Sequence, residues 1–190
     1  MKYYTGIGSR ETPKPILEIM ERIGQYLAEQ GWTLRSGAAP GADTAFEKGC
    51  KSAKGDKEIY LPWASFGQRP LNKDGYFCMK IKDRAMSAKA GVIAAKHHPA
   101  AEYLTPAAMD LHTRNVFQVL GQDLTTPASF VVCYSGPAGG TQQARRIALA
   151  NNIPIFNLID GQDAILALKK FLEMPIGGWC PFTHATVVLV

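Results

Sequence analysis

Three short apolar segments of this chain each run into a glycine-containing turn, and each turn is followed by a segment of helical spacing or composition. The first turn is Gly6-Ile7-Gly8-Ser9-Arg10, the second spans residues 36–43 and the third spans residues 135–141. Strand, turn and helix repeated in this order favour parallel strand pairing through right-handed crossovers. The sequence therefore predicts an α/β fold of Rossmann type, with a mainly parallel sheet covered by helices in three layers.

The spacing of apolar residues and of breakers predicts the individual elements. The first helix is expected to begin at Thr12-Pro13, where a capping hydroxyl precedes a proline, and to end at Gly31. Residues 63–106 contain several prolines and are predicted to form an insertion or lid, with one irregular helix at residues 76–96. The remaining predictions are strands at 3–7, 32–35, 58–61, 130–134 and 153–158, helices at 42–53, 106–120, 142–151 and 163–172, and a strand-like tail at 186–190.

Length and composition restrict the class of protein. A chain of 190 residues fits a single domain with a buried core. No apolar run reaches the roughly 20 residues of a spanning helix, and the first residues lack a secretory pattern, so a cytoplasmic protein with no membrane partner is expected. The net charge of +5 favours an anionic partner, and both phosphate-bearing small molecules and nucleic acid stay open. Four cysteines without a C-x-x-C pair are expected to be reduced thiols: Cys50, Cys78, Cys133 and Cys180.

The three turns are expected to meet, because ligands of open parallel sheets collect outside the carboxyl ends of the strands. Glycine allows close approach of the backbone, and the N–H groups that begin the following helix attract anions. The second turn, Ser36-Gly37-Ala38-Ala39-Pro40-Gly41-Ala42-Asp43, is predicted to cradle the phosphate of a nucleotide or nucleotide derivative. Neither G-x-G-x-x-G nor the P-loop pattern is present, and a purely structural role of the glycine loops is the alternative.

Four segments together resemble the SLOG superfamily. They are Gly8-Ser9-Arg10, residues 36–49 with the sequence SGAAPGADTAFEKG, Arg114-Asn115, and Gly139-Gly140-Thr141. This superfamily includes the DNA-processing protein A (DprA) of natural transformation, the Lonely guy (LOG) cytokinin-activating phosphoribohydrolases and nucleotide-sensing domains of antiviral systems. The resemblance spans about residues 3–175, and S-G-x-A-x-G-x-D is its most specific part. The sequence as a whole most resembles short DprA-like proteins of bacteriophages.

The resemblance implies a ligand site and an assembly. It implies a homo-oligomer, with a location in the host cytoplasm if the chain is encoded by a phage. The implied ligand- and phosphate-binding residues are Gly8, Ser9, Arg10, Ser36, Gly37, Ala39, Gly41, Asp43, Arg114, Asn115, Gly139, Gly140 and Thr141.

Catalysis has weaker support in the sequence. Phosphoribohydrolases of this group carry P-G-G-x-G-T-x-x-E, and Ala144 stands here at the position of the glutamate. A methyl group neither stabilises an oxocarbenium-like centre nor orients a water molecule. Asp43 or Glu47 is considered as the catalytic carboxylate in place of that glutamate. The alternative role of Asp43 is to cap the helix that follows it.

Three functions follow, with binding favoured over catalysis. The leading hypothesis is a protein that senses or sequesters a phosphorylated nucleoside, a cyclic nucleotide or an ADP-ribose-type signal, including in phage counter-defence. The second is an N-glycosidase acting on nucleoside 5′-monophosphates. The third is a DprA-like protein that binds single-stranded DNA through a basic edge and aromatic platforms. The residues considered for this role are Lys48, Lys51, Lys54, Lys57, Trp63, Phe66, Tyr76 and Phe77. The favoured alternative for them is a solvated lysine face with packed aromatic side chains.

No metal and no cofactor is predicted. A metal would use the histidine-rich group, which consists of His97, His98 and His112 with Glu102 nearby. The spacing of these residues matches no common ligand motif.

Overall fold

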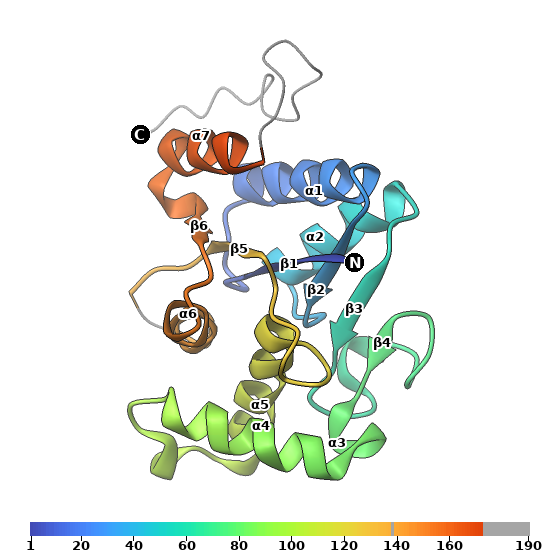
Figure 1. The fold of residues 1–190 in the computed structure, drawn as a ribbon, viewed down its shortest axis with the longest axis vertical. Coiled ribbons are helices and arrows are strands. Elements are labelled where there is room, and N and C mark those ends of the chain that lie inside the picture. Colours follow the sequence, from blue (N-terminus) through green and yellow to red (C-terminus); the bar gives the residue numbers. More distant parts are fainter. Residues whose placement is uncertain (138, 173–190) are drawn as a thin grey trace.

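The computed structural model describes residues 1–137 and 139–172 of the chain. Its six strands form one sheet in which every neighbouring pair is parallel (Figure 1). The predicted α/β class with a parallel sheet and helices on both faces is confirmed. The strands are β1 Lys2–Gly8, β2 Trp32–Ser36, β3 Lys57–Tyr60, β4 Tyr76–Phe77, β5 Phe130–Tyr134 and β6 Ile155–Asn157.

The order of the strands reverses beside β1. Across the sheet the order is β4-β3-β2-β1-β5-β6, so the chain first moves outward from β1 to β4 and then returns to the other side of β1 with β5. At such a switch point, the connections that leave two neighbouring strands run to opposite faces of the sheet and leave a crevice. The turns after β1 and β5 border this crevice.

Helices cover both faces of the sheet and complete three layers. On one face, α1 (Lys14–Glu29), α2 (Ala42–Ser52) and α7 (Gln162–Phe171) share a core cluster with strand residues such as Leu34 and Phe130. On the other face, α5 (Pro106–Leu120) and α6 (Thr141–Ala150) share a second cluster with Ile7 and Val131. Helix α4 (Arg84–Lys96) adds Ala90 and Ala94 to this second cluster and packs against α5 (Figure 1).

Residues 63–106 contain more elements than the one irregular helix predicted at residues 76–96. They form β4, a short helix α3 (Met79–Lys82), α4, and 3-10 helices at Phe66–Gln68 and Ala101–Tyr103. The predicted helix is interrupted because Asp83 is extended and caps α4, its side chain accepting a hydrogen bond from the backbone N–H of Met86. The segment also extends the sheet, since β4 pairs with β3.

Thr12 does not cap the first helix. Helix α1 begins at Lys14 after Pro13, and the hydroxyl of Thr12 instead donates to the carbonyl of Ser9 over 2.8 Å. The backbone of Pro13 is already extended at the cap position, which leaves Thr12 one residue too early. Its hydroxyl therefore fixes the turn after β1 rather than the end of α1.

Cys50, Cys78 and Cys133 are buried free thiols, in line with the prediction for them, whereas Cys180 and the strand-like tail at 186–190 lie outside the described residues. Within residues 1–137 and 139–172, every helix is too short or too polar to cross a membrane.

Candidate functional site

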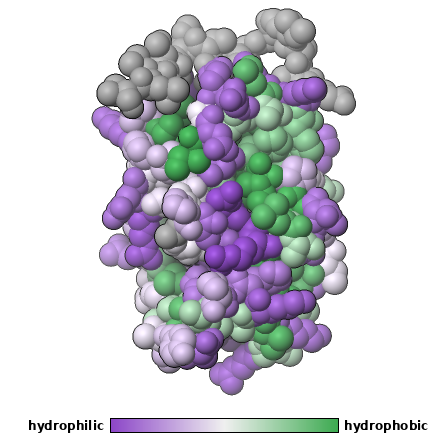
Figure 2. Space-filling view, turned by 90° about the vertical axis from the view of Figure 1, so that its left-hand side faces the viewer, coloured by the Kyte–Doolittle hydropathy of each residue, from purple (hydrophilic) through white to green (hydrophobic). Residues whose placement is uncertain are grey.

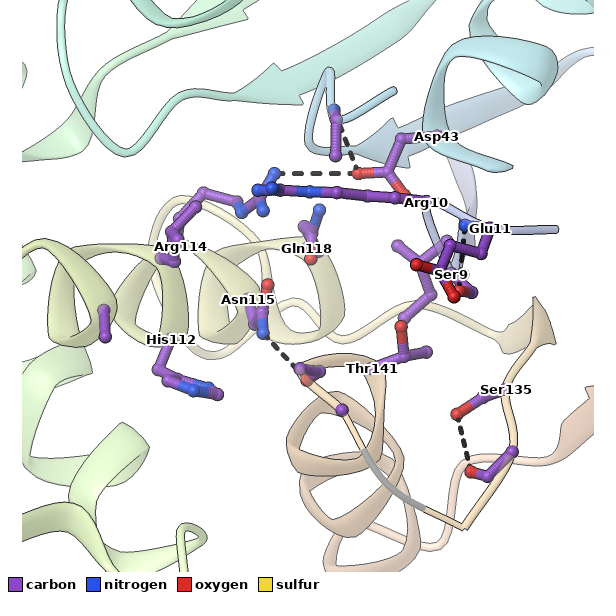
Figure 3. A pocket seen from close by; sticks show the side chains of 18 residues that line it. Ser9, Arg10, Glu11, Asp43, His112, Arg114, Asn115, Gln118, Ser135 and Thr141 are labelled. Atoms are coloured by element: carbon purple, nitrogen blue, oxygen red, sulfur yellow. Dashed lines mark hydrogen bonds and ion pairs between the residues drawn. The ribbon is translucent and has the colours of Figure 1, made fainter. Parts of the chain in front are cut away.

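A cavity of about 450 Å³ lies at the switch point between β1 and β5. Its walls come from the turns after β1, β2 and β5 and from one side of α5 (Figure 3). The side chains of Arg114, Asn115 and Gln118 project from α5 toward these turns. The structure thus brings together ten of the predicted ligand residues: Gly8, Ser9, Arg10, Ala39, Asp43, Arg114, Asn115, Gly139, Gly140 and Thr141.

The turn after β1 is held rigidly and carries Arg10 to the mouth of the cavity. The backbone N–H of Ser9 donates to the carbonyl of Tyr134 on β5 over 3.0 Å, and the Ser9 hydroxyl accepts from the N–H of Glu11. A Cβ at Gly8 would lie 2.7 Å from the Cβ of Ala42, so only glycine fits between this turn and α2. Arg10 itself is exposed, which leaves its guanidinium free to meet an incoming anion.

The turn after β2 is closed by contacts within the protein. Ser36 is buried and its hydroxyl donates to the carbonyl of Gly6 over 2.6 Å. A Cβ at Gly37 would lie 1.6 Å from Nη1 of Arg114, and one at Gly41 would lie 2.7 Å from the carbonyl oxygens of Ser9 and Arg10. These three predicted ligand residues therefore do not line the cavity and instead allow the turns to pack against each other.

Asp43 places its own carboxylate at the N-terminus of α2. The side chain lies in the first turn of this helix, accepts from the N–H of Ala39 at 3.4 Å and lies 3.6 Å from Nη1 of Arg114. Both residues are buried, with 4 % and 7 % exposure. Burial raises the pKa of Asp43, and the Arg114 charge and backbone N–H groups oppose that rise only in part. A carboxylate thus stands where the sequence predicts the phosphate of a ligand.

Two buried nitrogen atoms beside this pair have no hydrogen-bond partner among the described residues. They are Nε2 of Gln118, a residue with 1 % exposure, and Nε of Arg114. A buried polar group without a partner costs about 1–3 kcal/mol. Both residues line the cavity, so a hydrogen-bond acceptor or an anion in the cavity would satisfy donors that the protein leaves unpaired.

The turn after β5 is open toward the cavity. Among the described residues, a Cβ at Gly136, Gly139 or Gly140 would meet no heavy atom within 4 Å, in contrast to the glycines of the other two turns. Helix α6 begins at Thr141 without a side-chain cap. The N–H groups of Gln142 and Gln143 donate to the carbonyls of Gly139 and Gly140 over 3.1 and 3.3 Å, whereas the N–H of Thr141 has no partner among the described residues and is able to bind an anion. Asn115 fixes the turn to α5, because its Nδ2 donates to the carbonyl of Gly140 over 3.2 Å.

Glu47 lies outside the cavity, and the prediction that it acts there as a catalytic carboxylate is not supported by its position. Its carboxylate is 2.7 Å from Nζ of Lys51, 3.4 Å from Nζ of Lys57 and 3.0 Å from Arg69, and accepts from the hydroxyl of Tyr76. Burial tends to raise its pKa, but the contacts with Lys51, Tyr76 and Arg69 outweigh burial and lower it. Glu47 is thus an ionised structural residue that joins α2 to the β3–β4 region.

Three of the four lysines considered for a basic edge that binds single-stranded DNA form ion pairs. Lys51 and Lys57 contact Glu47, and Lys48 lies 2.8 Å from Glu21. Trp63 and Phe66, two of the aromatic residues of this region, pack edge to face with 5.2 Å between ring centroids. The arrangement matches the alternative of a solvated lysine face with packed aromatics.

Gln118 and His112 are two of the cavity-lining residues that are not among the predicted ligand residues. Gln118 follows Arg114 by four positions, and this helical spacing is the signal that would place both on one face of α5. His112 lines the cavity with its ring 4.5 Å from that of His98, measured between centroids. Among the described residues, the histidines and acidic side chains form no group of three that is able to hold a metal ion.

No family model and no curated protein matches the chain. Two solved structures are similar to it at a low level. A molybdenum cofactor binding protein from Rippkaea orientalis has 14 % identity and a TM-score of 0.47, over 90 % of this chain and 85 % of its own. The molybdenum cofactor carrier protein from Chlamydomonas reinhardtii has 19 % identity and a TM-score of 0.41, over 91 % and 99 %. The function is therefore argued from the cavity itself.

Proposed function

We propose that the protein binds a phosphorylated nucleoside or a related nucleotide derivative in the switch-point cavity. One observation carries the proposal: Nε of Arg114 and Nε2 of Gln118 are buried donors without a partner among the described residues, and both residues line the same cavity as the open turn after β5. Buried polar groups are nearly always hydrogen-bonded, so unpaired donors on a cavity wall point to a ligand that accepts hydrogen bonds.

The phosphate is assigned to the turn after β5. The turn after β2, which carries the more specific motif, is closed by Arg114 and by the carboxylate of Asp43. The N-terminus of α6 offers the N–H of Thr141 beside Gly139 and Gly140, which have no Cβ to hold a phosphate at a distance. The exposed Arg10 at the rim attracts the same charge.

Binding is favoured over turnover by the position of Ala144. This residue is fully buried in the core cluster between α6 and the sheet, so the carboxylate of the phosphoribohydrolases that the sequence resembles has no counterpart at this position. A protein that binds a nucleotide signal without cleaving it senses or sequesters that signal, which is also a means of phage counter-defence.

Isothermal titration against nucleoside monophosphates, cyclic nucleotides and ADP-ribose tests the proposal. In Gln118→Leu, an apolar side chain of similar size replaces the unpaired amide, so the variant is expected to fold with an unchanged or higher melting temperature. Its affinity is expected to fall at least tenfold, because a hydrogen bond to a charged group contributes about 1.5–3 kcal/mol.

The matched control is Gln162→Leu, which changes an exposed residue of α7 outside the cavity and is expected to bind like the unmodified protein. Absence of heat with every compound at high micromolar concentration would overturn the proposal. So would unchanged affinity in Gln118→Leu.

N-glycosidase activity on nucleoside 5′-monophosphates is the second candidate, and the position of Asp43 is the observation that favours it. Asp43 lines the cavity, and burial raises the pKa of its carboxyl group, which favours the protonated form that a general acid needs. Chromatography of the same mixtures for free base tests this candidate. Release of base that is lost in Asp43→Asn supports it, whereas intact nucleotide in every mixture rejects it.

A further inference from the structure

A second cavity of about 420 Å³ adjoins the first one across the turn after β5. The two cavities share Gly139, Gly140 and His112 in their walls. Beyond this divide the second cavity is lined by residues of α6 and of the segment that follows α4, chiefly Arg146 and His98. Its volume is close to that of the first cavity, so a second chemical group of similar size fits there.

The lining of the second cavity favours an anion. Arg146 is exposed on α6 and uses Nη1 to donate to the carbonyl of His97 over 3.2 Å. A guanidinium has five N–H donors, so most of them stay available. No acidic side chain is found among the described residues that line this cavity, whereas Asp43 and Glu11 line the first one. On the side of the molecule where the turn after β5 lies, hydrophilic side chains gather across the middle (Figure 2).

Gly139 and Gly140, which lie between the two cavities, present backbone without a side chain. Among the described residues, a Cβ at Gly139 or Gly140 would meet no heavy atom within 4 Å, so there is open space for ligand atoms beside these two residues. Beside the glycines, the ring of His112 packs edge to face on His98 and forms a wall common to both cavities.

We propose that one ligand occupies both cavities and that it is a nucleotide with a second phosphate group. The first phosphate lies at the N-terminus of α6 near Arg114 and Gln118, and the second lies across Gly139-Gly140 beside Arg146. This inference rests on the proposed function and narrows it, because a nucleoside monophosphate would leave the second cavity empty.

Calorimetric titration with adenosine 5′-monophosphate, adenosine 5′-diphosphate and adenosine 3′,5′-bisphosphate tests the inference. At least one of the two compounds with a second phosphate is expected to bind tenfold or more tightly than the monophosphate. Arg146→Gln is expected to remove this gain, so that the affinities of all three compounds become similar. Lys89→Gln is the control, because it removes the same charge from an exposed position on α4 that lines neither cavity.

The results separate this inference from the proposed function. If the monophosphate binds and the other two compounds bind no more tightly, the second subsite is rejected and the proposed function stands. A gain that survives in Arg146→Gln rejects the role of Arg146 in the same way. If none of the three adenine nucleotides binds while another compound of the earlier panel does, the inference is overturned for adenine nucleotides alone. Absence of binding to every compound overturns both.

Discussion

Two pairs, each formed by a buried arginine and a carboxylate, differ in how completely they are bonded. In the first, Nε of Arg35 lies 2.7 Å from the carboxylate of Glu58, and Nη1 donates to the carbonyl of Thr126 over 2.5 Å. Glu58 also accepts from the hydroxyl of Tyr60 over 2.7 Å. In the second pair, Arg114 and Asp43 are 3.6 Å apart, and Nε of Arg114 has no partner among the described residues.

This difference indicates that the Arg35–Glu58 pair stabilises the fold, whereas the Arg114–Asp43 pair has a donor available for a ligand. Arg35 is enclosed, since a Cβ at Gly121 would lie 2.7 Å from its Nη2 and the ring of Tyr3 covers its guanidinium. Arg114 lines an open cavity and burial lowers its pKa, opposed by the charge of Asp43. A fully bonded buried network stabilises one fold, whereas a partly bonded one at a cavity keeps donors for another molecule.

Replacing Arg35 by methionine is expected to have the largest effect on stability. It leaves Glu58 without its charged partner, and breaking a buried pair in this way costs about 3–5 kcal/mol. Arg114→Met is expected to cost less, about 1–3 kcal/mol, because it removes a longer ion pair and one hydrogen bond to the carbonyl of Gly37. Urea unfolding of both variants measures the difference.

Double-mutant cycles sharpen this result. The coupling energy of Arg35→Met with Glu58→Gln is expected to exceed that of Arg114→Met with Asp43→Asn. Equal coupling energies would contradict the distinction between a closed and an open pair.

The buried carboxylates are expected to respond to acid in opposite ways. The lowered pKa of Glu47 means that its contribution to stability is complete above the ordinary glutamate pKa of about 4.3 and is lost as the pH falls below that value. Asp43 has a raised pKa, so its protonation in acid favours the folded state. Glu47→Gln is expected to lose about 1.5–3 kcal/mol at pH 7 and to unfold less steeply in acid.

Melting temperatures from pH 7 to pH 3 check this expectation, with Asp43→Asn as the matched variant on the same helix. Asp43→Asn is expected to keep the acid-dependent loss of stability that Glu47→Gln removes. The same pH profile in both variants would show that Glu47 does not carry the acid dependence.

The sequence predicts the strands around β1 because each combines an apolar run with a glycine turn. It does not predict β4, since Tyr76–Phe77 is too short for any periodic signal and forms only because β3 offers a parallel edge. The three turns meet as expected, because the carboxyl ends of parallel strands lie at one edge of the sheet.

The site is predictable only in part, and the two candidate carboxylates show why. Asp43 and Glu47 are four residues apart on α2, which is a displacement of about 6 Å along a helix. Asp43 is in the first turn and reaches the edge of the sheet, whereas Glu47 lies one turn farther and meets Tyr76 and Lys57. The sequence does not identify Gln118 as a site residue for a similar reason, because only the packing of α5 shows that this side chain is buried.

Gly140→Ala is expected to have the smallest effect on stability and a clear effect on binding. Its backbone already has helical angles, φ −61 and ψ −31, and the added methyl group would meet no protein atom within 4 Å. The free energy of unfolding is expected to change by less than about 0.5 kcal/mol. The methyl group projects where the ligand approaches, so affinity is expected to fall tenfold or more in calorimetry.

Gly91→Ala is the control for the same chemical change, because Gly91 lies within α4, lines neither cavity and has only the hydroxyl of Thr113 within reach, at 3.7 Å. It is expected to raise stability by up to about 1 kcal/mol through helix propensity and to leave binding unchanged. If Gly140→Ala binds as tightly as Gly91→Ala, the open turn after β5 does not contact the ligand. The contrast between the two arginine pairs would then have to be explained without a ligand at that turn.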